Sequence, residues 1–107
     1  MALQRIDHVQ VAGPPGCEPA ARTFYGEILG LREVQKPAAL ADRGGVWFAL
    51  GTQELHVGVE QDFRPAHRAH PALTSTSIDE IAGRLATAGA RVDWNDDIGG
   101  VRLSSAF

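Results

Sequence analysis

Residues 54–60 read ELHVGVE, and the alternation in this stretch determines how the rest of the chain is interpreted. Positions 55, 57 and 59 are apolar and alternate with other residues, which predicts a β-strand with one face toward a core. The opposite face then carries Glu54, His56 and Glu60. That face is either a solvated surface of a sheet or part of a metal site, and residues from other strands must decide between the two.

Working outward, the neighbouring segments alternate strand-like and helix-like patterns separated by turn residues. The first helix has Pro19 in its first turn and ends at Gly30, and Ser77 with Glu80 predicts a capping box for the second helix, which ends at Gly89. The predicted strands are 3–11, 31–36, 45–50, 54–60, 70–77, 90–95 and 100–107, and the predicted helices are 18–30 and 78–89.

The order strand, helix ending in glycine, strand, turn, strand occurs twice. His8 lies 22 residues before Gly30, and His70 lies 19 residues before Gly89. The chain therefore reads as one domain with module one at 1–60, a linker at 61–69 and module two at 70–107. Only module one has a fourth strand, so we expect about ten to fifteen residues, one turn plus one strand, to be missing after Phe107.

Three of the predicted strands carry a histidine on the face away from the aliphatic residues: His8, His56 and His70. Imidazole and carboxylate are ligands that suit Zn, Ni, Fe or Mn, and ligands from separate strands converge if the sheet curves into a cup. The alternative is a half-exposed sheet that presents these polar residues to water.

Composition limits the function classes. The 107 residues carry a net charge of −3, which gives no reason to expect nucleic acid or an anionic membrane as partner. The single cysteine excludes an intrachain disulfide, and no signal peptide or apolar run of about 18 residues is present. We therefore expect a cytoplasmic protein with a small-molecule partner.

Four stretches together resemble the vicinal oxygen chelate superfamily, the glyoxalase, bleomycin-resistance and extradiol-dioxygenase group. They are IDHVQVAGPP (6–15), ARTFYGEILGL (21–31), GGVWFALGTQELHVGVE (44–60) and AHPALTSTSIDEIAGRLATAGARV (69–92). The resemblance implies an α+β fold of two βαβββ modules whose mixed sheet forms a cup around a divalent metal ion. The metal positions match His8, His70 and His56, with Glu54 as the substitute for His56. A terminal DPxGNxxE segment, which supplies a fourth ligand in relatives, is not in this sequence.

The resemblance implies an enzyme that chelates two neighbouring oxygens of a small substrate on Zn, Ni, Mn or Fe(II), as a lyase, isomerase or dioxygenase. Glu54 or Glu60 would then move a proton. The alternative is a non-catalytic dimeric protein that binds a drug-like ligand. Residues that would line either site are Trp47, Trp94, Arg64 and Arg102, although tryptophans on strands and arginines in linkers more often serve packing and solvation. An incomplete cup leaves unpaired strand edges, so a homodimer is expected.

Overall fold

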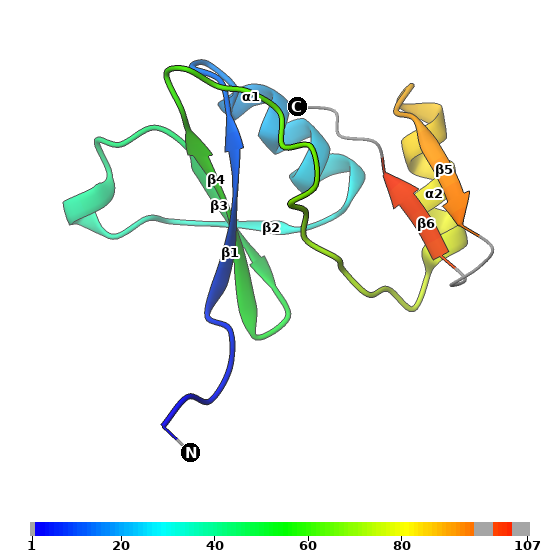
Figure 1. Ribbon diagram of the computed structural model, residues 1–107, viewed down its shortest axis with the longest axis horizontal. Helices are drawn as coiled ribbons and strands as arrows, with labels where there is room; N and C mark the ends of the chain where they lie inside the picture. Colours follow the sequence, from blue (N-terminus) through cyan, green and yellow to red (C-terminus); the bar gives the residue numbers. More distant parts are fainter. Residues whose placement is uncertain (1, 96–99, 104–107) are drawn as a thin grey trace. The chain divides into compact units, whose positions relative to one another are not determined.

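The structure is a computed structural model that describes residues 2–95 and the backbone of residues 100–103. The chain forms two compact units, Met1–Pro71 and Ala72–Phe107 (Figure 1). The first unit contains β1 (His8–Gly13), α1 (Glu18–Ala21), the π-helical η1 (Arg22–Ile28), β2 (Arg32–Val34), the 3-10 helix η2 (Ala38–Leu40), β3 (Val46–Leu50) and β4 (Gln53–Val59). The second contains α2 (Ile78–Thr87), β5 (Val92–Asn95) and β6 (Gly100–Leu103).

The first unit is a βαβββ module with a four-stranded mixed sheet in the order β1-β4-β3-β2. β1 runs parallel to β4, and the β2·β3 and β3·β4 pairs are antiparallel. A parallel pair needs a long crossover, and here the crossover comprises all the elements between β1 and β4. The pairing of β1 with β4 therefore joins the first and the last strand of the module.

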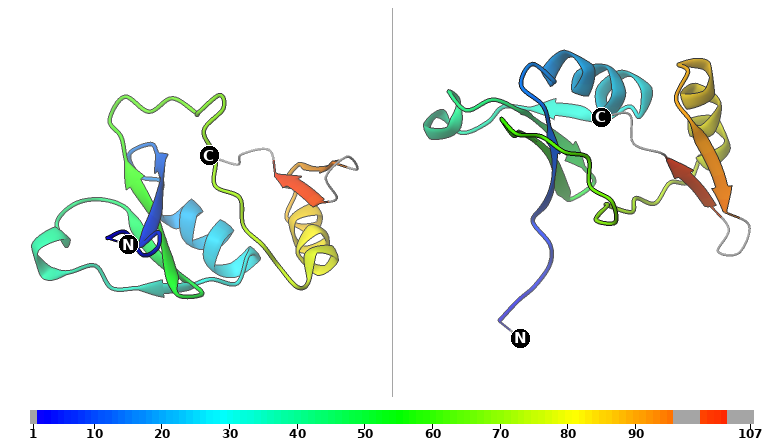
Figure 2. Two further views of the ribbon diagram at one scale, coloured as in Figure 1. Left: turned by 60° about the horizontal axis from the view of Figure 1, so that its bottom comes forward. Right: turned by 45° about the horizontal axis from the view of Figure 1, so that its top comes forward.

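The helical segment made of α1 and η1 packs on one face of this sheet (Figure 2). Tyr25 lies against Phe48, with ring centroids 5.6 Å apart, and meets Phe24 edge to face at 4.9 Å. The sheet side of this core consists of Val46, Phe48, Leu55 and Val57, each no more than 1% exposed. Burial of side chains of this size stabilises the fold by about 1.5–3 kcal/mol each, so this face is the main source of stability of the module.

Glycine ends both helices as expected. Gly30 and Gly89 have φ values of 77° and 81°, in the left-handed region that favours glycine. After α2, the N–H of Ala90 donates to the carbonyl of Leu85 at 2.9 Å, as in a Schellman motif. In the second unit Leu85 and Ala82 form the buried side of α2, which contacts both β5 and β6.

Two predicted elements need correction. β1 covers His8–Gly13 instead of 3–11, because its ladder with β4 continues to Gly13 opposite Val59 and begins only at His8 opposite Glu54. Residues 70–77 form no strand. In the part of the chain that the structure describes, this alternating segment pairs with no strand, and most of it is exposed to water.

The predicted capping box of the second helix is also wrong. Ser77 is the N-cap residue, but its side chain makes no capping hydrogen bond. The N–H of Ser77 donates to Oγ of Ser75 at 2.9 Å, and Glu80 instead forms an ion pair with Arg84 at 2.7 Å. Ser75, two residues before the cap, and Arg84, one turn after Glu80, are therefore the partners in place of the reciprocal cap.

A carboxylate joins the start of α1 to the loop before β3. Oε2 of Glu18 accepts a hydrogen bond from the N–H of buried Gly45 at 3.1 Å. This hydrogen bond lowers the pKa of Glu18 below its ordinary value, with the backbone N–H of Glu18 as the second cause. Nζ of Lys36 donates to the carbonyls of Arg43 and Gly45 on the same loop. Hydrogen bonds with Glu18 and with Lys36 therefore fix the position of this loop.

We expect Glu18→Ala to lower the free energy of unfolding by about 1 kcal/mol at neutral pH, because the Gly45 N–H loses a charged acceptor. The pKa of Glu18 is lowered in the folded state, so this contribution is complete above the ordinary value of 4.5 and is lost as pH falls through the folded pKa. Urea unfolding at about pH 7 and about pH 3 measures the difference. The control is Glu27→Ala, an exposed position on the same helical segment. Equal losses for both variants, or a Glu18 effect that grows in acid, would contradict this role.

Candidate functional site

The face of the first sheet that points away from α1 and η1 carries a set of polar and aromatic side chains. Cα partners in a sheet share a face, and the register pairs His8 with Glu54, Gln10 with His56, and Trp47 with His56. All five therefore lie on the face opposite Leu55 and Val57, as the alternation of residues 54–60 predicted. We call His8, Gln10, Trp47, Glu54 and His56 the polar-face cluster.

Three rings of the cluster form a stack. The Trp47 and His56 rings have centroids 3.8 Å apart and planes within 2° of parallel. The His8 and His56 rings have centroids 4.2 Å apart, at 15°. Because β4 lies between β1 and β3, the His56 ring lies between the other two. His56 is only 4% exposed, and among the described residues it is the one buried polar side chain.

Each histidine of the stack is held by a neighbouring carboxylate. Nε2 of His56 is 2.8 Å from Oε1 of Glu54, and Nδ1 of His8 is 3.0 Å from Oδ2 of Asp7. The hydrogen bond with His8 is the main reason that the pKa of Asp7 lies below its ordinary value, and the positive charge of Arg5 acts in the same direction. The rings are therefore oriented both by stacking and by hydrogen bonding.

Gln10 belongs to the polar-face cluster, although it was neither a predicted metal ligand nor a predicted catalytic group. A Cβ atom at position 58 would lie 2.6 Å from Nε2 of Gln10, so the carboxamide occupies the space above Gly58. A glycine inside an alternating strand is a signal of such close approach, and Gly58 in the stretch ELHVGVE is that signal. Asp7 lies inside the predicted strand 3–11 with the same parity as Val9 and Val11, so the alternation placed it on the aliphatic face and gave no signal of its contact with His8.

His70 lies outside any strand and is exposed, with Nδ1 2.6 Å from the carbonyl oxygen of Arg68. Within the described part of the chain, no group of three or more His, Cys, Asp or Glu side chains is arranged to hold a metal ion. The structure thus brings His8, His56 and Glu54 together, whereas the third histidine of the predicted ligand set is not grouped with them.

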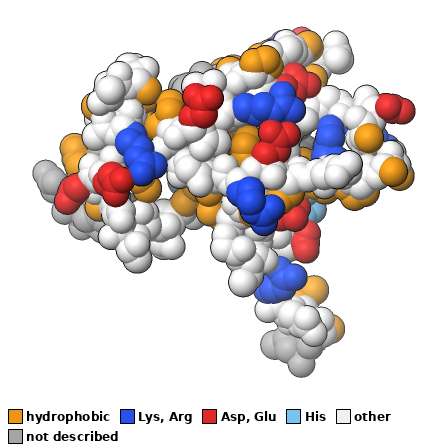
Figure 3. Space-filling view, turned by 180° about the vertical axis from the view of Figure 1, so that it is seen from behind, with side chains coloured by type: hydrophobic (Ala, Val, Ile, Leu, Met, Phe, Trp, Pro, Cys, Tyr) orange, Lys and Arg blue, Asp and Glu red, His pale blue; other side chains and the backbone are white. Residues whose placement is uncertain are grey.

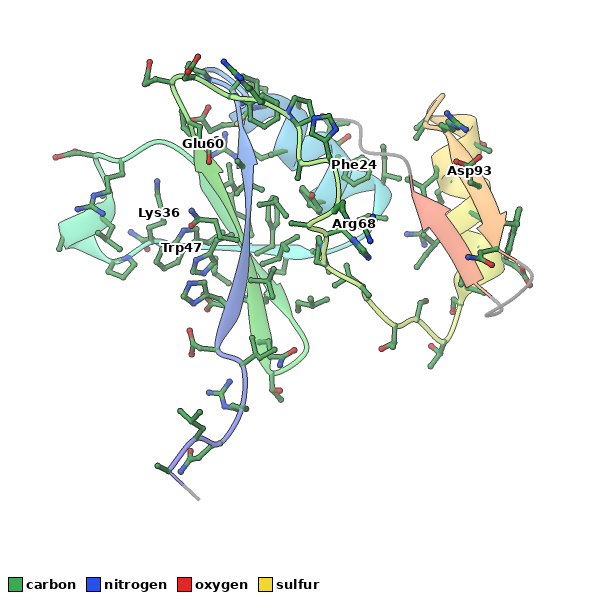
Figure 4. All side chains as sticks on the ribbon, viewed as in Figure 1. Phe24, Lys36, Trp47, Glu60, Arg68 and Asp93 are labelled. Atoms are coloured by element: carbon green, nitrogen blue, oxygen red, sulfur yellow. The ribbon has the colours of Figure 1, made fainter. Side chains whose placement is uncertain are left out.

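Glu60 lies beyond the end of β4, where its N–H donates to the carbonyl of Gly13 at 2.9 Å. Glu60 is six residue steps after Glu54 along extended chain, which corresponds to about 20 Å. Figure 4 shows Glu60 at one end of the strand, away from Trp47. Of the two predicted proton carriers, only Glu54 belongs to the polar-face cluster.

The remaining predicted ligand-binding residues are distributed over both units. Trp47 is in the cluster, whereas Trp94 lies on β5 of the second unit and is 53% exposed. Arg64 is exposed in the irregular segment after β4. Arg102 is on β6 with its Cα opposite Asp93, and its side chain lies outside the described residues.

On the face seen in Figure 3, Lys and Arg side chains are interspersed with Asp and Glu. None of the described helices has the length and apolar character needed to cross a bilayer.

Comparison with solved structures reveals extensive similarity in sequence and fold. A putative glyoxalase family protein from Bacillus anthracis is 48% identical, and the match covers 100% of this chain and 90% of that chain with a TM-score of 0.90. No protein-family model matches the chain. No curated protein sequence matches it.

Two more distant structures share the fold. Lactoylglutathione lyase from Agrobacterium tumefaciens is 19% identical, with a TM-score of 0.56 over 94% of this chain and 92% of that chain. The fosfomycin resistance protein FosX from Listeria monocytogenes is 14% identical, with a TM-score of 0.63 over 85% of this chain and 70% of that chain. The identity to the Bacillus anthracis protein extends over the whole chain, and the chain therefore belongs to the glyoxalase family of the vicinal oxygen chelate superfamily.

Proposed function

We propose that the protein is a divalent-metal-dependent enzyme that acts on a small molecule with two neighbouring oxygen atoms. The observation that carries the proposal is the meeting of His8, His56 and Glu54 on one face of the β1·β4 pair. Imidazole and carboxylate are donors that suit Zn, Ni, Mn or Fe(II), and His8 with one of the two β4 groups would supply two of the ligands. His70, which precedes α2 in the chain, would add the third imidazole of the predicted set.

The residues of the chain have distinct tasks in this proposal. His8 and one of the two β4 groups, His56 or Glu54, would hold the ion together with His70. A bound divalent ion supplies Lewis acidity, which stabilises negative charge on substrate oxygens. Glu54 is the carboxylate that could hold or move a proton, because it lies directly opposite His8 in the register. Gln10, whose carboxamide lies above Gly58, would orient a polar substrate group.

Support also comes from what the relatives are. The fold neighbours include a protein named lactoylglutathione lyase and a fosfomycin resistance protein, so the scaffold serves both lyases and proteins that deal with antibiotics. A cytoplasmic location and a homodimer belong to the same proposal.

Metal binding provides the direct test. We expect the chelator-treated protein to bind one ion of Ni(II), Zn(II), Mn(II) or Fe(II) per chain in titration calorimetry. Loss of a ligand should cost more than the 10- to 100-fold that is typical of supporting residues, so His8→Ala and His70→Ala should each weaken binding by more than about 100-fold. His67→Ala, an exposed histidine of the segment after β4, is the matched control. An absence of both heat and thermal stabilisation with all four ions would reject the proposal.

The alternative is a binding protein without chemistry, and the exposure of Trp94 favours it. A tryptophan that is 53% exposed on a strand offers a large ring to a planar ligand. In this case a planar aromatic drug would quench the fluorescence of the wild-type protein, and Trp94→Phe would abolish most of the quenching. His8→Ala and added chelator would leave the binding unchanged. Quenching that disappears with His8→Ala or with the chelator would instead favour the metal-dependent reading.

A further inference from the structure

β4 presents two groups that could serve a ligand, and the geometry separates their roles. We infer that His56 is a positioning residue that holds the Glu54 carboxylate, and that Glu54 together with His8 is what the polar-face cluster offers to a ligand. The identity of that ligand as a metal ion rests on the proposed function. The positioning of Glu54 by His56 is a property of the protein alone.

The orientation of the His8 and His56 rings does not suit a shared metal ion. A metal ion lies in the plane of the imidazole that binds it, along the lone pair of a ring nitrogen. The His8 and His56 rings are stacked with only 15° between their planes and 4.2 Å between their centroids. An ion in the plane of one ring is therefore displaced from the plane of the other, so the stacked rings are not arranged to share an ion.

A hydrogen bond connects the His56 ring to the Glu54 carboxylate. A carboxylate oxygen can only accept, so the 2.8 Å contact with Oε1 of Glu54 has Nε2 of His56 as the donor. In a neutral ring this leaves Nδ1 as the lone-pair nitrogen. His56 thus uses the nitrogen at the tip of its ring to orient Glu54, as a supporting residue does for a ligand.

Solvent reaches the side chains of Glu54 and His8 far more than that of His56. The His56 side chain is 5% exposed, whereas the Glu54 and His8 side chains are 39% and 44% exposed. Glu54 and His8 are also Cα partners in the β1·β4 ladder, so they emerge side by side. Trp47 covers the His56 ring from β3 at 3.8 Å, which restricts its side-chain torsions and keeps Nε2 directed at Glu54. The accessible pair is therefore His8 and Glu54.

The metal-free protein allows a test that does not depend on the proposed function. Two-bond ¹H–¹⁵N spectra of histidine rings, recorded in chelator at mildly alkaline pH, distinguish the two neutral tautomers. We expect His56 to carry its proton on Nε2 in the wild type, and the population of the Nδ1–H tautomer to rise in Glu54→Ala because the hydrogen bond that reinforces Nε2–H is lost. A wild-type His56 with its proton on Nδ1, or a tautomer unaffected by Glu54→Ala, would overturn the inference.

Metal affinity then separates a supporting residue from a ligand. His56→Gln keeps an N–H donor for Glu54, so we expect it to weaken binding by less than about tenfold. His56→Phe keeps a stacking ring without the donor and should weaken binding by about 10- to 100-fold. Glu54→Ala should cost more than about 100-fold, as His8→Ala does. A His56→Gln effect as large as that of His8→Ala would make His56 a ligand, and an unchanged affinity in His56→Phe would remove its positioning role.

Folding of the variants is followed by the emission of Trp47 in a Trp94→Phe background and by circular dichroism. If a His56 variant does not fold, the tautomer measurement on the wild type and Glu54→Ala still decides the question. If the wild type binds no ion, the proposed function fails, whereas the inference about His56 and Glu54 stands or falls on the tautomer alone.

Discussion

The parallel ladder between β1 and β4 is the constraint on which the rest of the first unit depends. It pairs His8 with Glu54 and Gly13 with Val59, residues that are far apart along the chain. Side chains alternate between the faces of a sheet, so a slip by one residue would move every side chain of β1 to the other face relative to β4. The same register therefore places Leu55 and Val57 under the helical segment and His56 beside His8. The register that buries the core residues is therefore the same register that assembles the polar-face cluster.

Burial of His56 in this arrangement has a clear physical basis. A polar group removed from water is costly unless it is hydrogen-bonded, and His56 has Glu54 as partner for Nε2. Its two ring faces contact the Trp47 and His8 rings and so need no water. The side chain of Glu54 remains more than a third exposed, so its carboxylate stays in contact with solvent. The result is a rigid buried imidazole beneath an accessible carboxylate, a layout in which the inner residue orients the outer one.

The predicted strands and the predicted helix cap had different outcomes, each with its own physical reason. In the first unit the alternating stretches 45–50 and 54–60 became β3 and β4 because each had neighbouring strands to pair with. Residues 70–77 alternate equally well, but alternation describes only side-chain facing and does not supply a backbone partner. Ser77 and Glu80 had the correct spacing for a capping box, and the competing partner Arg84 one turn later took the carboxylate. Patterns that need only local contacts with one outcome, such as the glycines that end both helices, were predicted correctly.

The sequence by itself determined the family, the apolar and polar faces of residues 54–60, and the placement of His8 and His56 on the same face. These depend on periodicity, on turn residues and on the order of motifs along the chain, all of which can be read one residue at a time. Only the tertiary structure decided that His56 is enclosed between Trp47 and His8, that its Nε2 faces Glu54, and that Gln10 occupies the space above Gly58. Parity places a side chain on a face, but ring orientation and access to solvent depend on the neighbouring strands, which come together only when β1 pairs with β4.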